Sequence, residues 1–88
     1  MSHEAPALRA CLLDLLAQRS PEASICPSEV ARSMAPAQDA WRALMEPVRH
    51  QAQQLAREGV IVITQGAHSL DPEGPFNGPI RLRRGPGF

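Results

Sequence analysis

The segment PVRHQAQQLAREGVIVITQ, residues 47–65, joins an amphipathic helix to a strand, and this junction decides the fold class. Val48, Ala52 and Leu55 recur at helical spacing, so they form one apolar face of a helix over residues 47–58. Gly59 is placed to end that helix, because glycine adopts the left-handed conformation that often follows a last turn. The β-branched run VIVITQ predicts a strand over residues 60–65. The segment therefore predicts an α+β fold.

Upstream of this helix, the sequence AQDAWRALME predicts a shorter helical piece over residues 40–44, with Asp39 as its N-cap. Pro47 would clash with the carbonyl four residues earlier in one continuous helix begun at Asp39. We therefore expect two pieces, and a single kinked helix is the alternative. In both cases Trp41 and Leu44 continue the apolar face, which predicts Trp41 in the core.

The stretch ICPSEVARSM, residues 25–34, predicts another short helix with an unusual start. Cys26 takes the N-cap position, Pro27 suits the first turn, and Glu29 can reach back to the Cys26 N–H as in a capping box. The residues expected to face inward are Val30, Ala31 and Met34. The alternative is a reactive thiol at a helix N-terminus. The structural interpretation is favoured, because thiol catalysis needs an oriented base and no histidine is close in sequence.

The first helix is predicted over residues 6–19. Its apolar residues fall at helical spacing along one face: Leu8, Cys11, Leu12, Leu15 and Leu16. The following RSPEAS breaks the helix, and Ser24 and Ile25 can form a short extended piece that pairs with a sheet edge.

A second strand is predicted in PIRLRR, residues 79–84, with Ile80 and Leu82 inward. Three helical segments followed by this β-hairpin describe a winged helix-turn-helix, in which residues 66–79 form the wing, a long connection rich in Gly and Pro. We expect one domain over residues 6–84, with flexible termini at residues 1–5 and 85–88.

Composition excludes several classes of function. The 88 residues carry nine basic residues, all Arg, and nine acidic residues, so the formal net charge is zero. Two cysteines without CxxC spacing and three scattered histidines (His3, His50, His68) predict no disulfide framework and no metal site. Because the sequence has no catalytic constellation and no phosphate-binding loop, we expect no enzyme activity, no cofactor and no small-molecule ligand. The N-terminal segment does not resemble a signal peptide or membrane span, so a cytoplasmic location is expected.

The candidate site is a nucleic-acid-binding face on the helix of residues 47–58 and on the last strand. Arginine recognises guanine edges in the major groove and glutamine recognises adenine, while strand arginines can bind phosphates. The helix residues are Arg49, His50, Gln53, Gln54 and Arg57, and the strand residues are Arg81 and Arg83, which we expect to point outward together with Arg84. The predicted partner is double-stranded DNA.

A protein-interaction or self-association module is the alternative, because zero net charge is unusual for a dedicated DNA-binding domain. The two hypotheses differ in what they require of Arg49, Arg57 and Arg81. Unpaired arginines that converge on one face favour DNA. Neutralisation by nearby carboxylates, with Glu46, Glu58 and Asp71 as candidates, favours a protein partner.

Four motifs together are similar to those of a small bacterial family: ICPSEVAR, WRALM followed by VR, EGVIVITQ and GPIRLR. The family is catalogued as a domain of unknown function, number three-two-five-three in that series. The resemblance extends from about Leu12 to Arg83. It implies a winged-helix-like fold and no established activity, cofactor or catalytic residue.

Overall fold

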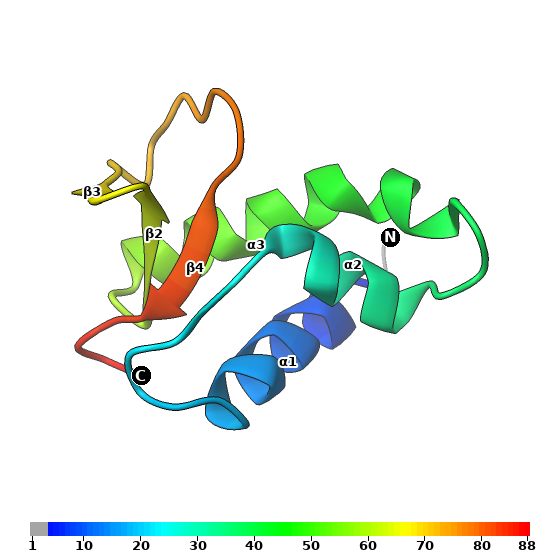
Figure 1. The fold of residues 1–88 in the computed structure, drawn as a ribbon, viewed down its shortest axis with the longest axis horizontal. Coiled ribbons are helices and arrows are strands. Elements are labelled where there is room, and N and C mark those ends of the chain that lie inside the picture. The colour runs from blue at the N-terminus through cyan, green and yellow to red at the C-terminus, as the bar shows by residue number, and fades with distance from the viewer. Residues whose placement is uncertain (1–3) are drawn as a thin grey trace.

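The computed structural model describes residues 4–88. Along the chain, the helices precede most of the strands of the sheet (Figure 1). In these residues the chain forms three α-helices, a short 3₁₀ helix and four strands. Their order is α1 (Glu4–Ala17), β1 (Ser24–Ile25), α2 (Pro27–Met34), η1 (Ala40–Leu44), α3 (Met45–Arg57), β2 (Ile61–Gln65), β3 (His68–Ser69) and β4 (Arg81–Arg84). The predicted α+β class is confirmed, and the arrangement is compatible with a winged helix.

The sheet is antiparallel throughout, with strand order β1-β4-β2-β3. Leu82 in β4 is paired with Ile25 of β1 on one side and with Ile63 of β2 on the other. Directly paired residues point to the same face of a sheet, so these three side chains form one row. All three are buried, which identifies this face as the one that packs on the helices. The predicted edge pairing near Ile25 is confirmed.

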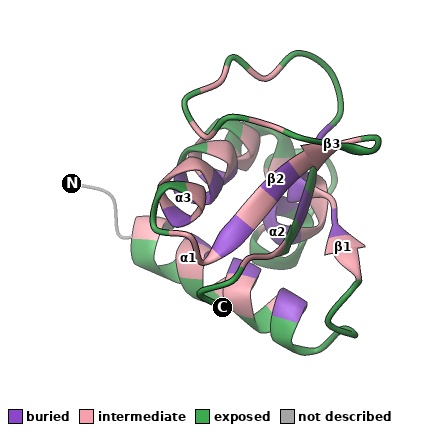
Figure 2. Cartoon of the chain, turned by 90° about the vertical axis from the view of Figure 1, so that its left-hand side faces the viewer, coloured by how far each residue is buried: buried purple, intermediate pink, exposed green. Residues whose placement is uncertain are grey.

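The core lies between the sheet and the three helices, where the buried residues of both layers meet (Figure 2). Helix α1 contributes Leu8, Leu12 and Leu16, whereas Cys11 and Leu15 are half-buried at its margin. The other buried apolar residues are Ile25, Val30, Ala31, Val48, Ala52, Leu55, Ile61, Ile63, Ile80 and Leu82. The helical spacing of each segment therefore predicted the centre of its buried face.

Helix boundaries differ from the prediction where proline is involved. Helix α3 starts at Met45, so that Pro47 is its third residue and its missing N–H falls in the first turn, where it costs nothing. The 3₁₀ helix occupies the predicted residues 40–44, which supports two pieces over one kinked helix. Gly59 follows α3 with φ +78°, as expected of a residue that ends a helix.

Three more residues predicted inward are not fully buried. Met34, the last residue of α2, is 38% exposed. Trp41 and Leu44 are half-buried and pack against the edge of the core, and the 3₁₀ helix that contains them has no buried residue.

The wing contains a strand that the sequence did not predict. Thr64 and Gln65 pair with Ser69 and His68, and Gly66, with φ +60°, begins the tight turn between β2 and β3. The rest of the wing returns to β4 as an irregular loop, visible at the top of Figure 1.

Near both ends of the described chain, residues form a helix or backbone hydrogen bonds. Helix α1 begins at Glu4, two residues before the predicted start, and residues 1–3 lie outside the described part of the chain. In residues 85–88, which were predicted to be flexible, Gly85 N–H donates to Val60 O at 2.9 Å and Gly87 N–H donates to Gly59 O at 2.8 Å.

Candidate functional site

The predicted helix residues lie together on α3, outside the row that contacts the core. His50, Gln53, Gln54 and Arg57 alternate around the side opposite Val48, Ala52 and Leu55, and Arg49 flanks them. We call Arg49, His50, Gln53, Gln54 and Arg57 the α3 polar face. His50 Nε2 and Gln54 Nε2 are 3.4 Å apart. Glu46, which is exposed, precedes His50 by one helical turn and Gln53 by two, so a carboxylate lies within the same surface.

Arg57 forms an ion pair with Glu73 of the wing. Its Nε and Nη2 atoms donate to the two carboxylate oxygens of Glu73 at 2.6 and 2.8 Å. The hydrogen bond from Arg57 lowers the pKa of Glu73 below its usual range, against a smaller upward effect of desolvation. Residues 66–79 include Asp71 and Glu73 but no Arg or Lys. The wing therefore brings negative charge to the α3 polar face.

The other candidate carboxylates behave differently from the prediction. Glu58 binds Arg9 of α1, with Nη2–Oε1 at 2.7 Å and Nη1–Oε2 at 3.2 Å, and not a residue of the α3 polar face. Asp71 accepts the Glu73 N–H at 2.8 Å and so shapes the loop that presents Glu73. The Arg49 side chain makes no hydrogen bond or ion pair with residues 5–88.

The strand arginines point away from the α3 polar face. Arg81 and Arg83 alternate with the inward Leu82, so they lie on the outer side of the sheet, whereas the α3 polar face lies on the outer side of the helix layer. Arg81 donates to Ser24 Oγ and Ser24 O, both at 2.9 Å, and Arg83 donates to Glu22 O at 3.0 Å. The structure therefore separates the two halves of the predicted site.

Arg84 has a structural role that the sequence did not indicate. Because it shares the inward side of β4 with Leu82, its guanidinium reaches the end of α1, where Nη2 donates to Leu16 O at 3.1 Å and to Arg19 O at 2.8 Å. Its carbon Cζ lies 4.7 Å from the centre of the Phe88 ring. Placing Arg84 outward beside Arg81 was therefore wrong, since it satisfies carbonyls that the end of a helix leaves free.

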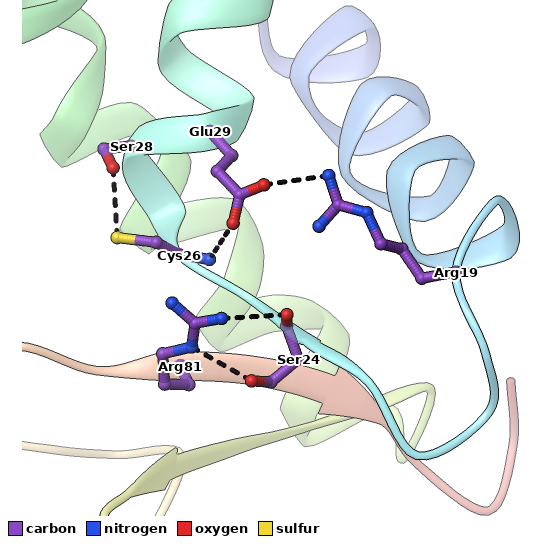
Figure 3. A network of polar contacts seen from close by, with 6 residues as sticks. All are labelled: Arg19, Ser24, Cys26, Ser28, Glu29 and Arg81. Carbon is purple, nitrogen blue, oxygen red and sulfur yellow. Dashed lines mark hydrogen bonds and ion pairs between the residues drawn. The ribbon is translucent and has the colours of Figure 1, made fainter.

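The start of α2 contains the predicted capping arrangement (Figure 3). Cys26 N–H donates to Glu29 Oε2 at 2.8 Å, Ser28 Oγ donates to Cys26 Sγ at 3.0 Å, and Arg19 pairs with the other Glu29 oxygen at 2.9 Å. Partial burial acts to raise the pKa of Glu29, but the Cys26 and Arg19 contacts outweigh it and lower that pKa. Each polar group near Cys26 therefore has a structural partner.

A cluster of different chemistry lies at Trp41. The guanidinium of Arg32 is 4.4 Å from the centre of the indole ring and that of Arg42 is 4.8 Å from it. Both arginines are exposed, whereas Trp41 is half-buried. Arg42 also contacts Asp39 at 3.4 Å, with side chains 68% and 80% exposed. We call Arg32, Trp41 and Arg42 the Trp41 surface. Sequence reasoning placed Trp41 in the core and so missed it.

No group of His, Cys, Asp or Glu side chains among residues 5–88 is arranged to hold a metal ion, and His3 lies outside these residues. No helix in the same part of the chain has the length and apolar character needed to span a membrane.

Comparison with known proteins identifies a family and nothing finer. A family model described as "Protein of unknown function (DUF3253)" matches residues 5–85, which is nearly the whole chain. No curated protein matches the sequence.

Proposed function

We propose that this chain, which belongs to the DUF3253 family, is a protein-interaction domain and does not recognise DNA through α3. The observation that carries the proposal is the ion pair between Arg57 and Glu73, with Nε–Oε2 at 2.6 Å. It places the carboxylate of the wing on the arginine that a recognition helix would offer to DNA.

DNA binding by a winged helix depends on cations that face the phosphates, because their neutralisation supplies the non-specific affinity. Here the wing carries Asp71 and Glu73 without any Arg or Lys, and Glu46 adds a third carboxylate beside the α3 polar face. A duplex approaching this side would meet these charges before it met a free Arg57. The strand arginines cannot compensate, since Arg81 and Arg83 lie on another side of the molecule.

A protein partner has no comparable requirement for positive charge. Protein interfaces are about as polar as the rest of a protein surface, and aromatic residues and arginine are enriched in them. A domain with zero net charge and an indole ring accessible beside two arginines meets that description.

Nucleic-acid binding remains the second candidate because of one residue. The Arg49 side chain has no hydrogen-bonding or ion-pair partner among residues 5–88, and it lies near the start of α3, where recognition helices concentrate their base contacts. Under this alternative, Arg49, Gln53 and Gln54 would face the groove after the wing had moved.

Photocrosslinking in the cells of origin distinguishes the two classes. A photoreactive phenylalanine analogue is placed at exposed Ala40 of η1 or at half-buried Gln53 of α3, with exposed Gln18 at the end of α1 as the control position. The proposal predicts adducts of discrete mass that protease removes and nuclease does not. Nuclease-sensitive adducts at Gln53, or no adduct above the Gln18 control at either position, would contradict it.

A further inference from the structure

We propose that the Trp41 surface is the docking site for an acidic segment of the partner protein. This inference rests on the proposed function and specifies its chemistry: carboxylates bound by Arg32 and Arg42, next to an apolar side chain against Trp41. Arg32 lies in α2, and Trp41 and Arg42 lie in η1, on the opposite side of Figure 1 from the wing.

Two cations lie against one aromatic ring. Arg32 and Arg42 lie 4.4 and 4.8 Å from the centre of the Trp41 ring, so the indole holds two positive charges on one small surface. A carboxylate that approaches this surface is attracted by both charges. The fold keeps the ring in place, because Trp41 packs against the core.

The charges of Arg32 and Arg42 are less well paired than those of Arg9, Arg19 and Arg57. Arg32 forms no ion pair with residues 5–88, and Arg42 contacts Asp39 at 3.4 Å through atoms of two largely exposed side chains. The ion pairs of Arg9, Arg19 and Arg57 are shorter, at 2.7, 2.9 and 2.6 Å. Exposed pairs of this loose kind contribute little to stability and are readily exchanged. An incoming carboxylate can therefore replace Asp39 at small cost.

The carboxylate of a peptide suits the Trp41 surface better than a phosphate backbone does. Guanidinium groups bind carboxylates through two parallel hydrogen bonds, and stacking on the indole holds both groups in advance, which reduces the entropy lost on binding. An extended phosphate backbone would also meet Asp39 and Glu46 on the same segment. A short peptide needs only one or two carboxylates and an apolar neighbour, so a protein segment is favoured over DNA.

Trp41 is the only tryptophan of the chain, so its fluorescence reports directly on this surface. The probe is the acetylated, amidated hexapeptide Glu-Glu-Phe-Leu-Glu-Glu, titrated into the full chain at low salt, with a control peptide that has Gln at the four Glu positions. We expect a saturable change in emission with the acidic peptide alone. Arg32→Gln should weaken binding about tenfold or more, the loss typical of a charge-assisted hydrogen bond. Arg9→Gln, which makes the same change in net charge on α1, should alter binding less than about twofold.

The result that would overturn the inference is no saturable change, an equal response to the Gln peptide, or equal weakening by Arg32→Gln and Arg9→Gln. Circular dichroism confirms that each variant is folded, and Arg42→Gln provides a second test should Arg32→Gln fail to fold. Displacement of the peptide by a random DNA duplex at equal charge would also overturn it, in favour of a general polyanion site. Failure of the peptide with protein adducts still present in cells would refute this surface alone, whereas nuclease-sensitive adducts would refute the proposed function.

Discussion

Arg57 in α3 and Glu73 in the wing, sixteen residues apart, are joined by two hydrogen bonds of 2.6 and 2.8 Å. The pair connects the wing to α3 and places the negative charge of Glu73 against the positive charge of Arg57. Gln65 fastens the other end of the same loop, since its Nε2 donates to Pro79 O at 3.0 Å. The long connection between β2 and β4 is therefore held at two points.

Removing the carboxylate should loosen the wing without unfolding the domain. Glu73→Gln is expected to increase amide hydrogen exchange across residues 70–78, while the urea midpoint stays nearly unchanged, because both side chains of the pair are exposed. Glu46→Gln is the matched control, since Glu46 forms no ion pair within residues 5–88. Unchanged exchange in the wing of Glu73→Gln would show that the pair does not hold the loop.

Acid should remove a contribution from Glu29. Its pKa is lowered in the folded state because the Cys26 N–H and Arg19 contacts outweigh the effect of partial burial. The carboxylate therefore stabilises the fold above its ordinary pKa of about 4.3, and this stabilisation is lost as the pH falls through the lower folded value. Urea unfolding at several pH values should show Glu29→Gln less stable than the parent at neutral pH, with the difference shrinking below about pH 4. Exposed Glu22→Gln is the control, and a difference that did not depend on pH would refute this role.

Two leucines of α1 should differ in what their truncation costs. Leu12 is fully buried, so Leu12→Ala should lower the free energy of unfolding by about 2–5 kcal/mol. Leu15 is half-buried, and Leu15→Ala should cost clearly less, because part of its side chain already contacts water. Chemical denaturation measures both values, and equal losses would mean that the buried face of α1 has been misplaced.

Arg84 should stabilise the end of α1. Arg84→Lys is expected to cost about 1–3 kcal/mol, because lysine Nζ lies one bond nearer the backbone than Arg84 Nη2, the atom that donates to Leu16 O and Arg19 O. Amides in the last turn of α1 should exchange faster in this variant. Arg83→Lys, which removes one contact with Glu22 O at an exposed site, should cost much less. Equal stability of Arg84→Lys and the parent protein would contradict this role.

Much of the fold follows from local patterns in the sequence. Val48, Ala52 and Leu55 define the buried row of α3, Gly59 ends it, and Leu82 pairs with Ile63 as the hairpin required. Strand β3 was missed because His68 and Ser69 carry no β-branched or alternating signal and owe their conformation to the turn at Gly66. Met34 follows the helical spacing, but it is the last residue of α2 and is 38% exposed.

The site was harder to predict, because periodicity gives the side of an element on which a residue lies and not its tertiary partner. The α3 polar face was assembled correctly, but nothing local connects Arg57 with Glu73 across the intervening strands. Carboxylate neutralisation was anticipated from Glu46, Glu58 and Asp71, whereas the pairing is with Glu73. Arg84 was assigned to the outer side of β4, although strand alternation places it on the same side as inward Leu82. Only its carbonyl partners at the end of α1 depend on the packed fold.

Fluorescence anisotropy tests most directly whether the α3 polar face fails to bind DNA, as we propose. The full chain is titrated to about 100 μM against a labelled random duplex at low salt, where non-specific binding is strongest. We expect no binding by the parent protein. Binding with a steep salt dependence, weakened in both Arg49→Gln and Arg57→Gln, would contradict it and establish the nucleic-acid function in its place.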